Sequence, residues 1–275
     1  MIDQAMHDWL LTPTGQYLLR WEHDYFSELS DDVFGYHALQ IGMTEFDALN
    51  GNRITHHWYS DPFLPSKSRQ ELSAHNVAIA AGINGYAVPV NLHHADTALP
   101  FATESVDLVV LPHTLDFSSN PHHLLREIGR ILVPEGQLIV SGFNPTSLWG
   151  LKQRWGRITG KHFLPNDISF IGLPRIKDWL ALLGFEPQQG YIGCYAPACK
   201  SDKGFERFKF MEKAGNRWWP YCGAVFIISA IKRVPALRLI GPAFKDKTAD
   251  FANAVSANQR VGNQRTSHLN NESIR

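Results

Sequence analysis

The hydrophobic positions of the chain follow two spacings, one helical and one typical of buried strands. Over residues 17–26 apolar side chains recur every three or four positions, which predicts a helix. Thr12 and Pro13 are a start signal for this helix, and Asp31, Asp32 and Gly35 end it. The apolar run Ala38–Ile41 then predicts a short strand.

The middle of the chain carries a compact alternation of strand and helix. Val106–Leu111 is a continuous apolar run of the kind found in buried strands. Pro121–Leu132 predicts a helix, because Asn120 suits its N-cap and its apolar residues fall on one face. After a turn at residues 134–136, residues 137–141 predict another strand. Strand, helix and strand in this order form a βαβ unit, which indicates a parallel sheet.

The rest of the chain extends this α/β pattern. Further strands are expected at residues 53–59, 88–95, 191–195 and 224–231, and further helices at 71–81 and 174–183. Residues 200–219 form a polar and aromatic insertion, and the chain loses its periodicity beyond residue 242. We therefore expect a helical extension at 1–34, one α/β domain at 35–242 and a disordered polar tail at 243–275.

Composition narrows the class of protein. The 275 residues include 26 basic and 26 acidic side chains, so no whole-chain basic field for nucleic acid exists. The three cysteines form no C-x-x-C motif, which indicates neither a disulfide framework nor a zinc site. The longest apolar stretch, near residues 223–231, is too short to span a bilayer, and the N-terminus is not a secretory signal. We expect a cytoplasmic protein without a membrane partner, whose oligomeric state the sequence leaves open.

An ordered series of motifs begins at Asp96 and ends at Phe143. After Asp96 come Leu99-Pro100-Phe101, the strand Val106–Val110, His113-Thr114-Leu115, Leu125-Arg126-Glu127, Arg130-Ile131-Leu132, Pro134-Glu135-Gly136 and Leu138-Ile139-Val140. This series resembles the type 11 branch of the class I methyltransferases that depend on S-adenosylmethionine (SAM). With Leu39–Gly42 and Ser141–Pro145 it is also similar to an uncharacterised proteobacterial subgroup of that branch.

The resemblance implies a doubly wound, mostly parallel seven-stranded sheet with helices on both faces, and S-adenosyl-L-methionine as the cofactor. Ligands of such sheets bind beyond the carboxyl ends of the strands. By this resemblance, Asp96 would accept a hydrogen bond from the adenine amino group and Thr97 would offer its backbone N–H to the ring. Pro112 and His113 would face the methionine end of the cofactor and the methyl acceptor.

The residues in and near this segment have different expected roles. His113 is the catalytic base that we name, with a structural hydrogen bonder or a pocket wall as the alternatives. Asp116 is a second candidate for the base. Asp107 lies inside a strand, so we expect a structural role for it. Asn144 and Pro145 follow the fifth strand, where they either line the acceptor pocket or start a loop.

The loop after the first strand departs from the family pattern of an acid followed by three glycines at alternate positions. Gln40 stands where the acid belongs, Gly42 is retained, and Thr44 and Phe46 replace the other two glycines. Glycine there lets the backbone approach a ligand, so Phe46 would take room that the cofactor's methionine part needs. Asp61, about twenty residues further on, is the candidate for the acid that binds the ribose.

Three functions remain open. The chain is a SAM-dependent methyltransferase acting on an unknown small or medium acceptor, or a catalytically inactive methyltransferase-like protein that binds a ligand or partner. Modification of RNA is the weaker third alternative, because residues 207–219 mix cations with aromatics in a way that suits bases or an anionic surface. The three pairs of adjacent histidines do not indicate a metal site, because neighbours in a strand point to opposite faces.

Overall fold

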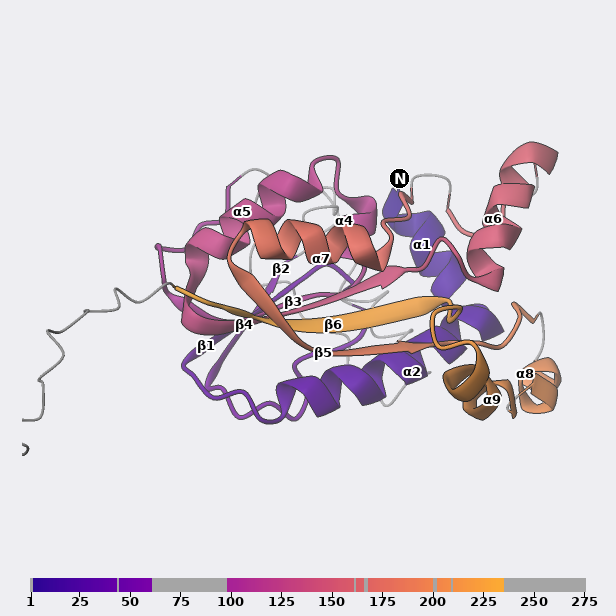
Figure 1. Ribbon diagram of the computed structural model, residues 1–275, viewed down its shortest axis with the longest axis horizontal. Helices are drawn as coiled ribbons and strands as arrows, with labels where there is room; N and C mark the ends of the chain where they lie inside the picture. Colours follow the sequence, from indigo (N-terminus) through magenta and orange to yellow (C-terminus); the bar gives the residue numbers. More distant parts are fainter. Residues whose placement is uncertain are drawn as a thin grey trace, which may run out of the picture. The chain divides into compact units, whose positions relative to one another are not determined.

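The computed structural model describes residues 2–43, 45–60, 98–160, 162–165, 168–199, 202–208 and 210–234. These residues form one mixed sheet with helices on both faces (Figure 1). Contacts divide the chain into two units, Met1–Val234 and Pro235–Arg275, and only the first is described. The tail expected at 243–275 therefore lies outside the described residues, and the three-part division of the chain stays a prediction.

Six strands make up the described sheet, in the order β2-β1-β3-β4-β6-β5. Their bounds are β1 His37–Ile41, β2 His56–Ser60, β3 Val106–Leu111, β4 Leu132–Phe143, β5 Phe185–Gly193 and β6 Val225–Lys232. The first four pair in parallel, whereas β6 runs antiparallel to both β4 and β5. The class is thus the expected doubly wound α/β fold. The strand predicted at 88–95 lies outside the described residues, so the count of seven stays a prediction.

The βαβ unit forms where the sequence indicates it. Helix α5 (Pro121–Ile131) begins with Asn120, whose side chain accepts a hydrogen bond from the backbone N–H of His123. One sequence expectation was wrong in detail, because β4 begins at Leu132 instead of after a turn at residues 134–136. The turn is present as a bulge inside the strand, with Glu135 at a φ of 64°.

Some of the other helices agree with the predicted ranges. They are α1 Ile2–Leu10, α2 Pro13–Ser30, α4 Thr114–Phe117, α6 Leu148–Thr159, α7 Leu173–Leu182, α8 Asp202–Phe208 and α9 Phe210–Trp218. The expected helices after Thr12 and near residues 174–183 are confirmed as α2 and α7. The insertion at 200–219 contains α8 and α9, and α1 and α6 were not expected. No described helix has the length and apolar character needed to cross a membrane.

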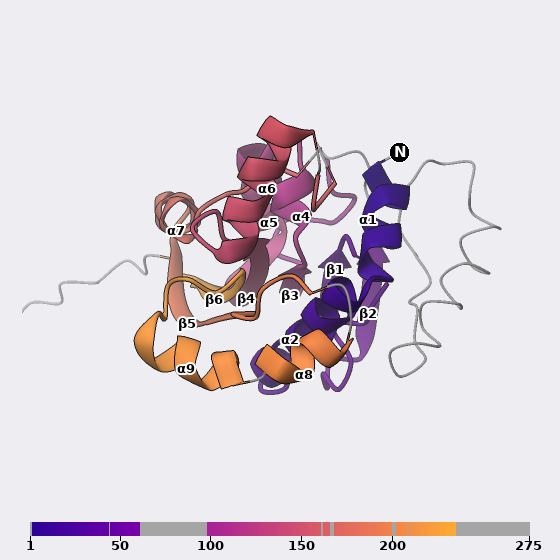
Figure 2. The same ribbon diagram turned by 90° about the vertical axis from the view of Figure 1, so that its right-hand side faces the viewer.

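Alternate residues of the strands point to opposite faces and build two cores. On one face, Leu108 and Val110 of β3 pack with α1 and α2. On the other, Val109 and Leu111 pack with α5 and α7. Figure 2 shows the sheet nearly end-on, with α5 and α7 on one side and α2 on the other. The carboxyl ends of the parallel strands therefore lie together at one edge of the sheet, between two layers of helices.

Candidate functional site at the strand tips

The expected ligand edge lies where β1, β2 and β3 end side by side. Ile41 of β1 pairs with Ser60 of β2, and Gln40 of β1 pairs with Val110 of β3. Pro112 and His113 follow β3 directly, and both are buried. The structure thus brings together four of the predicted site residues, Gln40, Gly42, Pro112 and His113.

The side chain of Gln40 holds the loop after β1 closed. Its amide nitrogen donates to the carbonyl oxygens of Gly42, Met43 and Phe46 at 3.3, 3.1 and 3.0 Å. Its oxygen accepts from the backbone N–H of Ala48 at 2.9 Å. Gln40 is fully buried, so these bonds form away from water and fix the loop strongly. A neutral amide at this position acts as an internal clamp of the loop.

The closed loop is also apolar. Phe46 is buried in the core on the α2 side, where its ring centroid lies 5.7 Å from that of Phe26. Gly42 keeps a left-handed φ of 81°, and a Cβ there would lie 2.9 Å from the hydroxyl of Thr114. The described part of the loop therefore offers one glycine, already in close contact with protein, where the family pattern has three.

In contrast to the apolar loop after β1, the tip of β3 carries charged side chains. The imidazole of His113 has its Nδ1 3.0 Å from Oδ2 of Asp116 and its Nε2 3.0 Å from Oε1 of Glu22. All three side chains are fully buried. The backbone N–H of Phe143 donates to the same Oδ2 of Asp116, and the ring of Phe143 lies 4.0 Å from that of His113. We call Glu22, His113 and Asp116 the tip cluster.

The charge state of the tip cluster follows from its two carboxylates. Burial alone would lower the pKa of His113, but the Glu22 and Asp116 carboxylates outweigh burial and raise this pKa to about 9. Burial raises the pKa of Asp116, and the contact with His113 opposes that rise. His113 is therefore a buried cation near neutral pH, with a carboxylate at each ring nitrogen.

The tip cluster does not have the arrangement of a metal site. Because its two carboxylates lie at opposite sides of the His113 ring, the three groups do not converge as metal ligands do. No cluster of side chains that could hold a metal ion occurs in the described part of the chain.

Several buried polar atoms at this edge have no hydrogen-bond partner among the described residues. They are Oε1 and Oε2 of Glu22, Oδ1 of Asp116, Nε2 of His113 and Oγ of Ser60 at the tip of β2. The atoms Oε1 of Glu22 and Nε2 of His113 lie at ion-pair distance without hydrogen-bond geometry. Unsatisfied buried polar atoms are rare in proteins, and most of those at this edge are hydrogen-bond acceptors. The chemistry of this edge thus calls for donors or positive charge.

The remaining predicted residues divide into two groups. Asp61, Asp96 and Thr97 lie outside the described residues, so their cofactor roles stay predictions. Asp107 is structural as expected, since its Oδ2 accepts from the backbone N–H groups of Tyr36 and His37 at 2.8 and 3.0 Å.

The sequence reading missed Glu22. It belongs to α2, where Leu18 and Phe26, four residues to either side, are fully buried. A carboxylate on the apolar face of a helix needs a partner, and that signal pointed to a buried charge.

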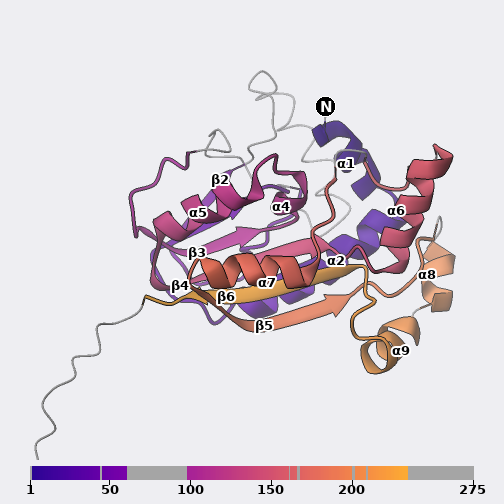
Figure 3. The ribbon, with the colours of Figure 1, turned by 45° about the horizontal axis from the view of Figure 1, so that its top comes forward.

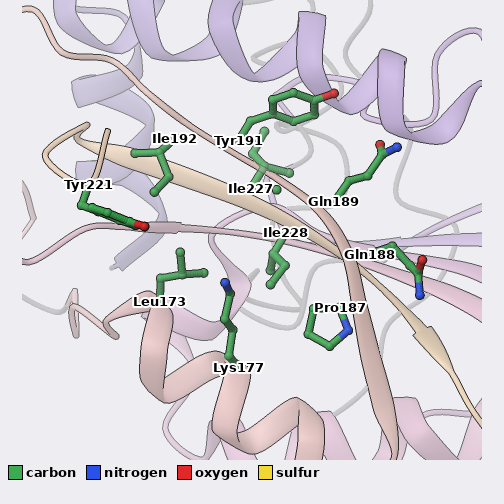
Figure 4. A pocket seen from close by; sticks show the side chains of 11 residues that line it. Leu173, Lys177, Pro187, Gln188, Gln189, Tyr191, Ile192, Tyr221, Ile227 and Ile228 are labelled. Atoms are coloured by element: carbon green, nitrogen blue, oxygen red, sulfur yellow. The ribbon is translucent and has the colours of Figure 1, made fainter. Parts of the chain in front are cut away.

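The described hollows lie away from this edge. One groove of about 300 Å³ runs between α7 and the strands β5 and β6, and Figure 4 shows Leu173 and Lys177 of α7 directed toward those strands. A second hollow of about 250 Å³ lies between Tyr17 of α2, Phe205 of α8 and Glu212 of α9. Neither is lined by Gln40, Gly42 or the tip cluster.

Part of this chain is similar to known proteins. Residues 51–140 match the family model described as a methyltransferase domain. An uncharacterised protein of Escherichia coli, YafS, is 38% identical over 110 residues, which make up 40% of this chain and 45% of that protein. The chain thus aligns with less than half of that relative's length. The family resemblance expected from the sequence is confirmed.

Solved structures show the same fold at low identity. A methyltransferase in complex with the activator Trm112 from Haloferax volcanii has a TM-score of 0.54 and 15% identity, covering 80% of this chain and 93% of its own. A SAM-dependent methyltransferase from Thermotoga maritima, described as a possible histamine N-methyltransferase, has a TM-score of 0.50 and 18% identity, with coverages of 80% and 96%. Identities this low establish the fold alone.

Proposed function

Because residues 51–140 carry a methyltransferase domain on the class I methyltransferase fold, we propose that the protein binds SAM at the strand tips and methylates a small or medium acceptor. The observation that carries this proposal is the excess of buried acceptors in the tip cluster. Two carboxylates face one imidazole, and two carboxylate oxygens beyond the ion-pair distances lack partners among the described residues. The methionine end of SAM carries an ammonium, a carboxylate and a sulfonium, so its net positive charge suits this site.

Each part of the edge has a role in this proposal. Ser60, whose buried hydroxyl has no partner among the described residues, and Asp61 after it would hold the ribose. Asp96 and Thr97 would hold the adenine. Gly42 and Pro112 would border the methionine part, and Glu22 with Asp116 would attract its positive charge. Bound SAM supplies an electrophilic methyl group for in-line displacement, and the protein aligns the acceptor and excludes water.

His113 is proposed to position charge at this site. An imidazole that is already protonated cannot take a proton from an acceptor. Its ring instead fixes Glu22 and Asp116 about itself at 3.0 Å on either side. The base role suggested by the sequence stays a prediction, and it requires His113 to lose its proton first.

Calorimetry with SAM and with S-adenosylhomocysteine tests the proposal. Asp96→Ala should weaken binding of SAM more than tenfold, about 1.4 kcal/mol or more. The matched control Asp32→Ala removes an exposed carboxylate before β1, at the opposite edge of the sheet, and should leave binding unchanged. Absence of heat with both nucleosides at millimolar concentration would reject SAM binding.

Glu22→Gln gives a sharper test of the charge argument. Removing this carboxylate should weaken SAM more than S-adenosylhomocysteine, since only SAM carries the sulfonium charge. Equal weakening of both ligands contradicts the argument. Circular dichroism of the variant checks that α2 remains in place.

A second candidate function has its own supporting observation. The Gln40 clamp and buried Phe46 close the loop that the family keeps open, which favours a methyltransferase-like protein that binds a partner without catalysis. Absence of heat with SAM in the same calorimetry would favour the non-catalytic protein, because catalysis requires SAM to bind. An RNA substrate has weaker support, from cations and aromatics near α9.

A further inference from the structure

Helix α6 presents most of its apolar side chains outward. Leu148, Leu151, Trp155 and Ile158 are 50, 63, 69 and 82% exposed. The residues that α6 buries against the protein are Trp149, Gly150, Gln153 and Gly156. A surface helix normally does the reverse, so this exposed row needs an explanation.

The exposed row is a continuous stripe. At 100° per residue the four side chains fall within an arc of about 80°, opposite the buried face. Lys152 and Arg154 lie on either side of this arc, and Arg157 lies further round the same helix. The helix contains no Asp or Glu. An apolar stripe bordered by cations is the arrangement of helices that lie in a membrane interface.

A second exposed aromatic group lies on α9 and the turn after it. Phe210, Trp218, Trp219 and Tyr221 are all more than half exposed. Exposed Lys213 and Arg217 accompany them, while the only carboxylate of α9, that of Glu212, is turned inward and accepts from the backbone N–H of Tyr195. Trp and Tyr are the residues that favour the boundary between water and lipid.

The two groups belong to the same edge of the sheet. Phe143, the last residue of β4, pairs with Val225, the first of β6, so the chain leaves toward α6 and arrives from α9 at one place. The side chain of Asn144 ties them further by donating to the carbonyl oxygens of Tyr221 and Gly223 at 2.8 and 2.9 Å. Figures 1 and 3 show α6 and α9 at the same end of the molecule, on opposite sides of the strands.

We propose that α6 and the α9 group form a docking surface for an anionic lipid membrane. The stripe and the aromatics enter the interfacial region, and Arg154, Lys213 and Arg217 meet the lipid phosphates. Docking in this way brings the carboxyl ends of the parallel strands to the lipid surface. The sequence expectation of no membrane partner rested on the lack of a spanning segment, and surface docking needs none.

The pattern favours lipid over other occupants. Aliphatic Leu148, Leu151 and Ile158 cannot stack on bases, so the stripe suits nucleic acid poorly. In a two-fold dimer built on α6, each stripe would meet its own copy, and flanking cations would face cations with no carboxylate on either helix. An anionic lipid surface satisfies both the apolar row and its charged borders.

Sedimentation of the full chain with vesicles tests this docking surface. Vesicles of phosphatidylglycerol and phosphatidylcholine in equal parts should bind the protein, added salt should weaken binding, and pure phosphatidylcholine should bind it far less. The double variant Trp155→Ser with Ile158→Ser should lower affinity by tenfold or more. Arg154→Glu, which keeps the stripe, should lower it by about fivefold or more.

A matched double variant controls for the loss of exposed apolar surface. Phe34 and Leu182 are 69 and 84% exposed and lie before β1 and β5, at the opposite edge of the sheet. Phe34→Ser with Leu182→Ser should leave vesicle binding unchanged. Thermal unfolding of each variant confirms that the surface changes leave the fold intact.

Other results would overturn the proposal. They are no binding to the mixed vesicles, equal binding to pure phosphatidylcholine, or equal loss in the control variant. A dimer that the Trp155 and Ile158 substitutions dissolve, or RNA retention without vesicle binding, would assign the surface to another occupant. Vesicle binding is measured without SAM, so it is independent of the result of calorimetry.

Discussion

The tips of β1 and β3 lie next to each other and use opposite chemistry. At β1, the neutral amide of Gln40 meets four backbone groups. At β3, two carboxylates flank one imidazole, and some buried oxygens have no hydrogen-bond partner among the described residues. At the β1 tip the side-chain amide makes all of its hydrogen bonds with the loop. At the β3 tip the buried acceptors can still accept hydrogen bonds or pair with a positive charge.

This difference separates a structural site from a candidate binding site. A satisfied network makes its segment rigid and gains nothing from a ligand. A buried excess of acceptors costs stability until something satisfies it, so it is retained where a ligand or partner supplies the missing group. In the proposed function, the loop after β1 therefore serves mainly as scaffold, and the charged tip of β3 is the part that would bind a ligand.

The largest expected effect comes from breaking the tip cluster. Asp116→Ala removes the acceptor of both His113 Nδ1 and the Phe143 backbone N–H. Because a buried pair loses one partner, the free energy of unfolding should fall by about 4 kcal/mol. Urea denaturation measures it, with exposed Asp32→Ala as the control expected within about 0.5 kcal/mol of the parent. A loss below about 1 kcal/mol would show that the contacts of Asp116 with His113 and Phe143 do not stabilise the folded protein.

A change of pH weakens the same cluster without mutation. The pKa of His113 in the folded protein, about 9, lies above its ordinary value of 6.5. The folded state therefore holds this proton more tightly, and its stabilising contribution is complete below pH 6.5 and lost as pH rises through 9. The expected loss is at most about 3 kcal/mol, at about 1.4 kcal/mol per pH unit.

Urea denaturation across that pH range checks the titration. The dependence should flatten in Glu22→Gln, which removes the larger of the two attractions on His113. Stability that stays level from pH 6.5 to pH 9 in the unmodified protein would contradict the raised pKa.

The smallest expected effect comes from restoring the family's acid at the β1 tip. In Gln40→Glu, a carboxyl group would face the carbonyl oxygens of Gly42, Met43 and Phe46 with only one N–H to accept from. The free energy of unfolding should fall by about 2 kcal/mol, and by more as the carboxyl ionises at higher pH.

Gln153→Glu is the matched control for that variant. Gln153 is equally buried, but its oxygen accepts two backbone N–H groups, from Phe163 and Leu164, and its amide donates once, to the carbonyl oxygen of Leu164. A carboxylate keeps both accepted bonds there, so the loss should be smaller than for Gln40→Glu. Equal losses would mean that the β1 clamp is not selective for an amide.

The sequence alone predicted an element correctly where several local signals agree. Asn120, Pro121 and the apolar spacing that follows them fix α5, and the apolar run at Val106–Leu111 fixes β3. The role of Asp107 also followed from its place inside a strand. These features depend on neighbours in the chain, which a sequence displays directly.

Other features depend on side-chain orientations that the hydrophobic pattern does not show. Nothing near Gln40 in the sequence indicates that its side-chain amide bonds to the backbone of Met43, Phe46 and Ala48, which follow it in the loop. Helix α6 was not expected, because its buried face contains two glycines and its apolar residues point outward. Periodicity reports which side chains are apolar, and it assumes that the apolar side faces inward.

The Glu22–His113 contact makes the tip cluster a reporter of assembly. The two residues lie about ninety positions apart in the chain, one in α2 and one after β3. The imidazole therefore acquires its unusual proton affinity only after α2 has docked on the sheet. Its NMR titration distinguishes a chain in which α2 is packed on the sheet from one in which the sheet has formed without α2.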